Sequence, residues 1–344
     1  MTVNAGGLIH RAGTVWFDIS ENGAFDDPAI WAPMSEHGIP LFNQLYANPQ
    51  PYRADVALII DRNSILYQKN DYDMALEQRA YVRYALAKAG VASAFYTLDD
   101  CLDGTEPPSQ VYIFANANYL TDDEITQIQS RLNAEGATAI WQYASGFLGP
   151  SGPDANRASR LTGIQLTQLD GYGYTSGAGA MAGYSWGLTN HNELSPRLVV
   201  TDPNAQVLGT YQSDNQVSSA MKKVGNFESI FIGEFTLGPF QPLAFGTAPS
   251  ANVLRALLQI TGVHMWSAVE DVVFTDGNLL VIHAAAAGPD SISLPAGVSA
   301  TPLGGGSAST GTLNITFSRV GETQWFQLSQ SSQGAKSTAR RRPK

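Results

Sequence analysis

The chain has 344 residues, of which 44% are hydrophobic and 15% are charged, and its formal net charge is −10. This length is enough for two domains with cores of their own, and the large apolar fraction excludes a disordered chain. The acidic balance excludes nucleic-acid binding, which needs clustered Lys and Arg side chains. No apolar run approaches the ~20 residues that span a bilayer, so no membrane partner is expected.

The first fifty residues predict a strand and a helix without a core of their own. Residues 13–19 have the pattern of a short buried strand, and a helix is expected from about Pro28 to Tyr46. One strand and one helix cannot bury two faces, so this segment needs something to pack against. Pro49 and Pro51 then mark a linker, because proline restricts its own backbone and that of the preceding residue.

From residue 54 onward the pattern alternates between strands and helices. Four apolar runs predict strands at residues 54–61, 92–96, 110–115 and 138–143. Nearly continuous apolar runs are typical of strands that are covered on both faces. A helix is expected at 73–88, and a second one begins at the capping box of Thr121 and Glu124 and ends at Gly136. The region therefore predicts a doubly wound, mostly parallel α/β sheet.

The second half of this region has weaker patterns. Residues 146–190 are rich in Gly, Ser, Thr and Ala and predict loops and short strands. Their glycine-rich stretches lack the strand–turn–helix context of a phosphate site, so flexible loops are favoured over a nucleotide site. Further strands are expected at 197–200, 207–211 and 228–235, and a last helix at about 250–261.

After Trp266 the pattern changes to short alternating strands. They are expected at residues 272–274, 278–283, 291–294, 311–317 and 323–328. Turn signals such as Asp276-Gly277 separate them, which predicts a small antiparallel β domain. The basic cluster from Lys336 to Lys344 is interpreted as a solvated tail. The predicted organisation is an N-terminal segment with linker, an α/β domain, a small β-sandwich domain and a disordered basic tail, at residues 1–50, 51–265, 266–330 and 331–344.

The single cysteine, Cys101, excludes an internal disulfide and a multi-cysteine metal site. Asp99, Asp100 and Asp103 lie close to it in the sequence and should raise the pKa of the thiol, which disfavours a reactive thiolate. The N-terminus shows no basic region followed by an apolar core. No signal peptide is therefore visible, and a cytoplasmic location is the default expectation.

Nucleophilic and metal chemistry find little support in the sequence. Ser145 follows the fourth strand, but Tyr143 and Phe147 stand where a nucleophile elbow has glycines, so a sharp turn is favoured. No two histidines have the spacing of a metal site on one helix face, and no metal or cofactor is expected. The five histidines are scattered, at His10, His37, His191, His264 and His283.

One loop has a composition that suits contact with a saccharide. Asp18, Glu21, Asp26 and Asp27 follow Trp16 within a few residues. Aromatic rings stack on sugar faces, carboxylates accept hydrogen bonds from hydroxyl groups, and glycosidases use a pair of carboxyl groups. We predict Trp16, Asp18 and Glu21 as substrate-binding residues, with an acidic surface loop as the alternative interpretation.

The order of these features carries a family resemblance. Trp16-Phe17-Asp18, a helix, the strand at 54–61 and Ser64-Ile65-Leu66-Tyr67 follow one another. This order resembles the region after the catalytic barrel in β-galactosidase-like glycoside hydrolases of the family 42 type. The strands and helices through Tyr143-Ala144-Ser145-Gly146-Phe147 resemble the trimerisation domain of that family, and the final β domain resembles its C-terminal β module. Further landmarks are Leu161-Thr162-Gly163-Ile164, Val207-Leu208-Gly209-Thr210-Tyr211 and Gly262-Val263-His264.

The resemblance implies a flavodoxin-like fold related to class I glutamine amidotransferases, and self-association, with a trimer among the expected assemblies. Family members cleave β-linked sugars with two glutamates on barrel strands upstream of the tryptophan-containing last strand. Only fifteen residues precede Trp16, so the barrel is expected to be missing, with residues 1–50 as a remnant of its end plus a linker. Its glutamates match no position here. The amidotransferase relation also lacks a Cys–His–Glu arrangement, since Cys101 does not follow the fourth strand.

The sequence therefore predicts a non-catalytic accessory and oligomerisation region of a β-galactosidase-like glycoside hydrolase. It would associate with copies of itself or with a catalytic barrel, and it would carry no catalytic residue. Two alternatives stay open. The chain could hydrolyse glycosides itself through Asp18, Glu21 and Asp26. It could also be a free carbohydrate-binding module that uses Trp16, Trp31, Trp141 or Tyr172.

Overall fold

A computed structural model describes residues 23, 26–47, 54–68, 82–187, 194–234 and 251–330. The contacts divide the chain into two compact units. The first, residues 55–265, is the α/β unit. The second combines the residues before 55 with those after 265, and we call it the β unit. None of the helices in the described ranges is long and apolar enough to cross a membrane.

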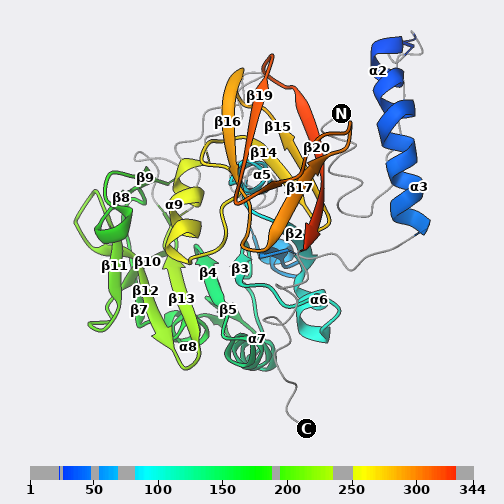
Figure 1. Ribbon diagram of the computed structural model, residues 1–344. Helices are drawn as coiled ribbons and strands as arrows, with labels where there is room; N and C mark the ends of the chain where they lie inside the picture. Colours follow the sequence, from blue (N-terminus) through cyan, green and yellow to red (C-terminus); the bar gives the residue numbers. More distant parts are fainter. Residues whose placement is uncertain are drawn as a thin grey trace. The chain divides into compact units, whose positions relative to one another are not determined.

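A nine-stranded sheet forms the centre of the α/β unit (Figure 1). Five neighbouring strands of it are parallel, in the order β2 (Ser93–Thr97), β1 (Val56–Ile60), β3 (Val111–Phe114), β4 (Thr138–Gln142) and β13 (Phe227–Ile232). This arrangement corresponds to the strand order 2-1-3-4-5 of flavodoxin-like folds. The predicted fold class and its four leading strands are confirmed.

Antiparallel strands extend the sheet beyond β13. They are β12 (Val217–Val224), β11 (Gln206–Tyr211), β8 (Thr175–Gly177) and β9 (Ser185–Trp186). Short pairs outside the sheet are β10 (Arg197–Val200) with β7 (Leu166–Leu169), and β5 (Leu148–Gly149) with β6 (Gly152–Pro153). The pattern analysis did not find β12, because Ser218, Ser219, Lys222 and Lys223 give it no apolar run. It forms because β11 and β13 pair with it on both sides.

Helices cover both faces of the parallel strands (Figure 1). On one face lie α6 (Leu98–Asp103), α7 (Asp122–Glu135) and α8 (Ala155–Thr162), and on the other lie α5 (Val82–Ala87) and α9 (Asn252–Ile260). Neighbouring strand residues divide between the two cores, since Ile59 packs with the first group and Leu58 with the second. Among the described residues of this unit, η2 (Ser64–Tyr67) and η4 (Gly179–Met181) are short 3-10 helices.

The predicted capping box at the start of α7 is confirmed. The Thr121 hydroxyl accepts a hydrogen bond from the Glu124 N–H at 3.3 Å, and the Glu124 carboxylate accepts one from the Thr121 N–H at 2.6 Å. A second capping box, of Thr97 and Asp100, opens α6 directly at the end of β2. Both helices end at a glycine with positive φ, Gly104 at 77° and Gly136 at 64°.

We expect Thr121→Ala to lower the free energy of unfolding by about 1 kcal/mol, because it leaves an N–H at the start of α7 without a partner. Thr126→Ala, in the exposed middle of the same helix, is the matched control and should change it by less than about 0.5 kcal/mol. Urea unfolding followed by circular dichroism measures both. Equal losses in the two variants would contradict the capping role.

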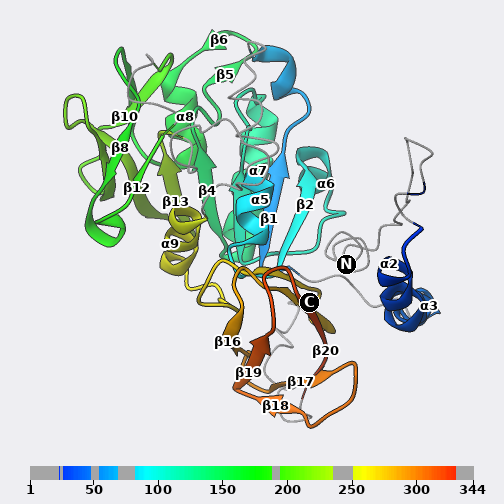
Figure 2. The ribbon, with the colours of Figure 1, turned by 90° about the horizontal axis from the view of Figure 1, so that it is seen from above.

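Two antiparallel sheets build the β unit (Figure 2). One has the order β14 (Val272–Thr275), β15 (Leu279–His283), β20 (Thr323–Gln330), β17 (Val298–Pro302) and β18 (Ser309–Thr310). The other pairs β16 (Gly288–Ser293) with β19 (Thr312–Phe317). Side chains such as Ile282, Ile292, Leu313 and Phe326 form its core. The predicted antiparallel β domain is confirmed, and β17 and the two-residue strand β18 are the strands that the pattern does not predict.

The predicted N-terminal helix is also confirmed, as α2 (Pro28–Pro33), the π-helical turn η1 (Met34–Gly38) and α3 (Ile39–Ala47). Asp27 caps it by accepting a hydrogen bond from the Ala29 N–H at 2.8 Å. Leu41 packs with Leu279 and Val281 of the β unit. The strand predicted at residues 13–19 lies outside the described residues.

Candidate functional site

The predicted sugar-binding residues Trp16, Asp18 and Glu21 lie outside the described residues, so their role stays a prediction. Asp26 and Asp27, from the same acidic loop, are exposed. Asp27 is engaged as the cap of α2. The structure thus gives one carboxylate of this loop a purely local function in helix initiation.

Trp141, considered above for sugar stacking, is unsuited to it. Its side chain is fully buried in β4, and its indole N–H donates to the Ser229 hydroxyl at 2.9 Å. Its ring stacks on Phe114 with 4.5 Å between centroids. This interpretation was wrong because Trp141 belongs to the core under α7. Trp31 and Tyr172 are 41% and 49% exposed.

Cys101 lies in α6 and is buried. Burial raises the pKa of its thiol to about 12, and the nearby Glu106 carboxylate adds to this effect. The predicted direction is confirmed, but the cause differs from the predicted one, because burial and Glu106 raise the pKa rather than Asp99, Asp100 and Asp103. A thiolate nucleophile at this position is therefore disfavoured.

The turn after β4 is sharp, as predicted. Ser145 is fully buried, and its hydroxyl donates to the carbonyl of Gln142 at 3.0 Å. The strained residue of this turn is Tyr143, whose φ is 55°. Positive φ is unfavourable for a bulky side chain and is often found where a fold must aim a residue into a site.

A cavity of about 400 Å³ opens beside this turn, and we call it the strand-edge pocket. Tyr67 and Gln68 reach it from the segment after β1, Asn118 from the segment after β3, and Tyr143 and Phe147 from the turn after β4. The carboxyl ends of parallel strands lie at one edge of a sheet, and open α/β sheets bind ligands there. This position makes the pocket the candidate site of the α/β unit.

The polar groups of the strand-edge pocket are neutral. None of the described residues that line it carries a charge. Asn118 is only 4% exposed, and its side-chain oxygen Oδ1 accepts no hydrogen bond from the described part of the chain. Burial raises the pKa of the Tyr143 hydroxyl, and the carboxylate of Glu234 raises it further, so Tyr143 stays protonated at neutral pH.

An ion pair between a buried arginine and a more exposed carboxylate supports the chain next to this pocket. Arg197 follows the pocket residue Pro196 and is 2% exposed. Its guanidinium binds Asp214 at 2.6 Å and lies 4.9 Å from the ring centroid of Tyr211. The Tyr211 hydroxyl in turn donates to the carbonyl of Leu198 at 2.8 Å. These contacts hold the start of β10 in place.

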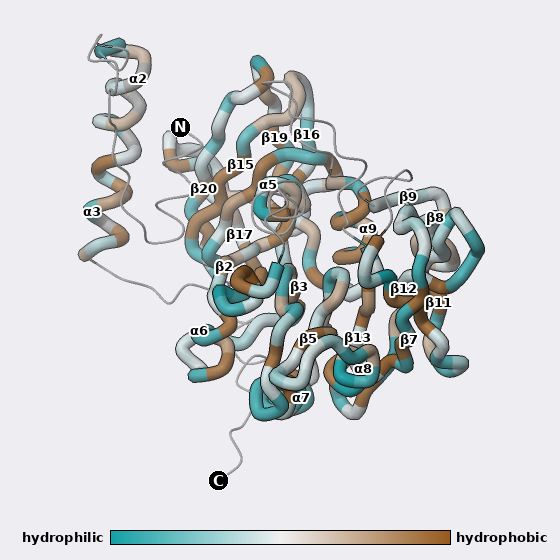
Figure 3. Tube along the Cα trace, turned by 180° about the vertical axis from the view of Figure 1, so that it is seen from behind, coloured by the Kyte–Doolittle hydropathy of each residue, from teal (hydrophilic) through white to brown (hydrophobic). Residues whose placement is uncertain are grey.

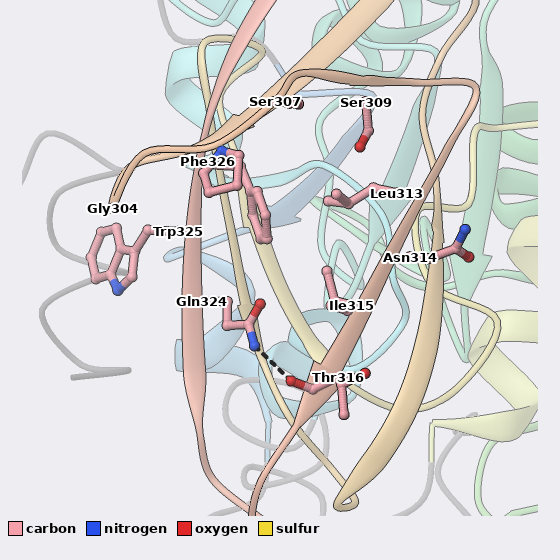
Figure 4. A pocket seen from close by; sticks show the side chains of 11 residues that line it. Gly304, Ser307, Ser309, Leu313, Asn314, Ile315, Thr316, Gln324, Trp325 and Phe326 are labelled. Atoms are coloured by element: carbon pink, nitrogen blue, oxygen red, sulfur yellow. Dashed lines mark hydrogen bonds between the residues drawn. The ribbon is translucent and has the colours of Figure 1, made fainter.

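A second cavity, of about 510 Å³, lies in the β unit (Figure 4). Leu313, Ile315 and Phe326 point into the space between β19 and β20. Trp325 lies on the other face of β20 and points away from this space. The Gln324 amide donates to the carbonyl of Thr316 at 2.9 Å across it. The apolar side chains at its base belong to the core, so this cavity is an opening at the edge of the core.

In the described ranges, no three His, Cys, Asp or Glu side chains gather in a way that could hold a metal ion.

The sequence and the fold were compared with those of known proteins. No protein-family model matches the chain, and no curated protein matches it in sequence.

Solved structures do match. The β-galactosidase from Bacillus circulans sp. alkalophilus superimposes with a TM-score of 0.59 at 17% identity, over 87% of this chain and 45% of that one. A catalytic mutant of Gan42B, a GH42 β-galactosidase from G. stearothermophilus, gives 0.57 at 12% identity, over 90% and 45%. The chain has the fold of part of a GH42 β-galactosidase. The predicted resemblance is confirmed at the level of the fold.

The chain spans about 45% of the length of those enzymes. The α-L-fucosidase isoenzyme 2 from Paenibacillus thiaminolyticus shares the fold as well, with a TM-score of 0.50 at 13% identity, over 89% of this chain and 53% of that one. The same fold thus occurs in glycosidases whose names give different sugars, and it does not identify a substrate.

The strand-edge pocket was not predicted from the sequence, although polar residues after a predicted strand pointed to it. Asn116 and Asn118 directly follow the third predicted strand, and polar residues at that position often reach a ligand site in α/β folds. Asn116 has a structural role, because its amide donates to the carbonyl of Asp61 and accepts from the Asp61 N–H, each at 2.8 Å. Asn118 is the residue that lines the pocket.

Proposed function

We propose that this β-galactosidase-like chain is a non-catalytic accessory and oligomerisation region of a glycoside hydrolase. The observation that carries the proposal is the fold shared with about 45% of the length of GH42 β-galactosidases. The lining of the two cavities supports it. Glycosidases need two carboxyl groups on either side of the scissile bond, and no Asp or Glu appears among the described residues that line either cavity.

The N-terminal helix supports an assembly role. Ile39, Phe42 and Tyr46 are 50%, 44% and 81% exposed, and their spacing of three and four residues places them on one face of α3. Hydrophobic residues along α3 are visible in Figure 3. A cluster of exposed large apolar side chains is typical of surfaces that bind another protein. A second copy of the chain is the partner we propose, and a catalytic barrel is the alternative.

We expect the purified chain to self-associate in sedimentation velocity experiments. Phe42→Ser combined with Tyr46→Ser should weaken this association at least about tenfold, because it removes two large apolar contacts. Leu66→Ser is the matched control, since Leu66 is 81% exposed and lies in η2. A chain that stays monomeric at high concentration would contradict the oligomerisation role.

Turnover tests the non-catalytic part of the proposal. We expect the purified chain not to cleave an aryl β-galactoside. Cleavage that is lost in an Asp18→Asn variant would show instead that the acidic loop catalyses the reaction. Co-expression with a separate catalytic barrel, followed by co-purification, distinguishes a barrel partner from self-association.

A further inference from the structure

We propose that the strand-edge pocket binds a neutral saccharide of one or two sugar rings. Two independent features carry this inference. They are the buried acceptor of Asn118, which has no donor in the described part of the chain, and an aromatic lining without charge. The inference deepens the proposed function and depends on it only for the choice of galactose as the first sugar to test.

The position of the pocket is one at which α/β sheets bind ligands. The chain runs from β1 to its neighbour β2 and then returns to place β3 on the other side of β1. Strand order therefore reverses between β1 and β3, and the crevice outside such a switch point is where open α/β folds hold ligands. Tyr67 and Gln68 after β1 and Asn118 after β3 lie on the two sides of that point. The volume of about 400 Å³ is in the range of small-molecule sites.

Asn118 presents an acceptor that needs a donor. Its backbone is held in place, because its carbonyl accepts the Leu148 N–H at 2.8 Å and its own N–H donates to the Asn116 carbonyl at 2.7 Å. The side chain is 4% exposed, yet Oδ1 has no hydrogen-bond donor among the described residues. A buried acceptor without a donor is costly, and a sugar hydroxyl that enters the pocket would satisfy it.

The remaining lining suits the two faces of a sugar ring. Tyr67 stacks on Tyr119 with 4.0 Å between centroids and an interplanar angle of 1°, and it is 54% exposed, so one flat aromatic surface is available at the pocket. Phe147 adds an apolar wall, and the amides of Gln68 and Gln168 offer both donors and acceptors. Aromatic surfaces with a few amide and phenol groups are typical of small-molecule sites.

The charges around the pocket favour a neutral ligand. No Lys or Arg is among the described residues that line it, so a phosphate or carboxylate would find no counter-charge there. The nearby Glu234 carboxylate, which acts on Tyr143, would repel an anion further. A hydroxyl-rich neutral molecule satisfies Asn118 without this penalty.

The test is a titration of the full chain with galactose and with lactose, in which isothermal titration calorimetry and protein-observed NMR detect binding. Galacturonate is the charged comparison and should bind more weakly than galactose. Asn118→Leu should weaken galactose binding at least about tenfold, because it replaces the acceptor with an apolar group of similar size. It should leave the melting temperature unchanged or raised, since Oδ1 makes no hydrogen bond to the described protein.

Tyr67→Ala keeps the test valid if the Asn118 variant does not fold. Tyr84→Ala is its matched control, because Tyr84 is 53% exposed and lies on α5, away from the residues that line the pocket. We expect Tyr67→Ala to weaken galactose binding and Tyr84→Ala to leave it unchanged. Absence of binding to the unmodified chain, or equal binding by a folded Asn118→Leu variant, would overturn the proposal. Sedimentation of the same samples reports on the oligomerisation role separately, so either idea can fail alone.

Discussion

Replacing Arg197 with alanine is expected to lower the free energy of unfolding by about 3 kcal/mol, because it breaks the ion pair of a buried guanidinium and removes a packed side chain. Arg197 is 2% exposed, whereas its partner Asp214 is 38% exposed. The carboxylate left behind can therefore keep part of its hydration, and the loss should fall at the lower end of the range for buried pairs.

Two further variants separate charge from packing at Arg197. Arg197→Met keeps most of the volume beside Tyr211 and should cost less than Arg197→Ala. Arg62→Ala is the matched control, because the pair of Arg62 with Asp99 is exposed on both sides, and exposed pairs contribute about 0–1 kcal/mol. Chemical unfolding measures all three. A loss at Arg197 no larger than the loss at Arg62 would mean that the buried pair contributes little.

The second large effect is a pH dependence caused by Glu106. Its side chain is fully buried, and its Oε2 lies 3.5 Å from an Arg131 nitrogen, with the Cys101 thiol as a further neighbour. Burial raises the pKa of Glu106 to about 7 from an ordinary value of 4.5, and Arg131 opposes this shift only in part. At a pH between these two pKa values, Glu106 is protonated in the folded protein and ionised in the unfolded chain.

The free energy of unfolding should consequently fall as the pH rises through this window, by at most about 3 kcal/mol. Glu106→Gln removes the ionisable group, so the stability of this variant relative to the unmodified chain should increase from pH 5 to pH 8. Urea unfolding across this range measures it. Asp123→Asn, at an exposed position of α7, is the control and should follow the unmodified chain. A Glu106→Gln curve parallel to that of the unmodified chain would refute the assignment.

The contacts of Arg131 explain why it compensates the charge of Glu106 only in part. Arg131 donates to the Glu106 carbonyl and the Tyr112 hydroxyl, at 3.0 and 3.1 Å, and binds Glu135 at 3.0 Å. The guanidinium thus divides its donors among several acceptors, and the Glu106 carboxylate receives only a distant charge. Glu106 lies in a segment rich in Gly, Thr and Pro, whose composition alone indicates a surface turn.

The local elements of the fold can be read from the amino-acid pattern alone. Continuous apolar runs identified β1, β3 and β4, and the capping box at Thr121 with Gly136 marked both ends of α7. The switch to alternating short strands after Trp266 identified the β unit. These patterns can be recognised in the sequence because hydrophobic periodicity and helix capping depend on residues a few positions apart.

Long-range packing, in contrast, produces β12, the burial of Glu106 and the strand-edge pocket. A strand with a polar pattern is stabilised by its neighbours, and the burial of a carboxylate depends on what packs over it. The pocket joins Tyr67, Asn118 and Gln168, which are separated by about fifty residues at each step and meet because parallel strands bring their carboxyl ends to one edge. No local pattern encodes such a meeting, since it depends on the order of the strands in the sheet.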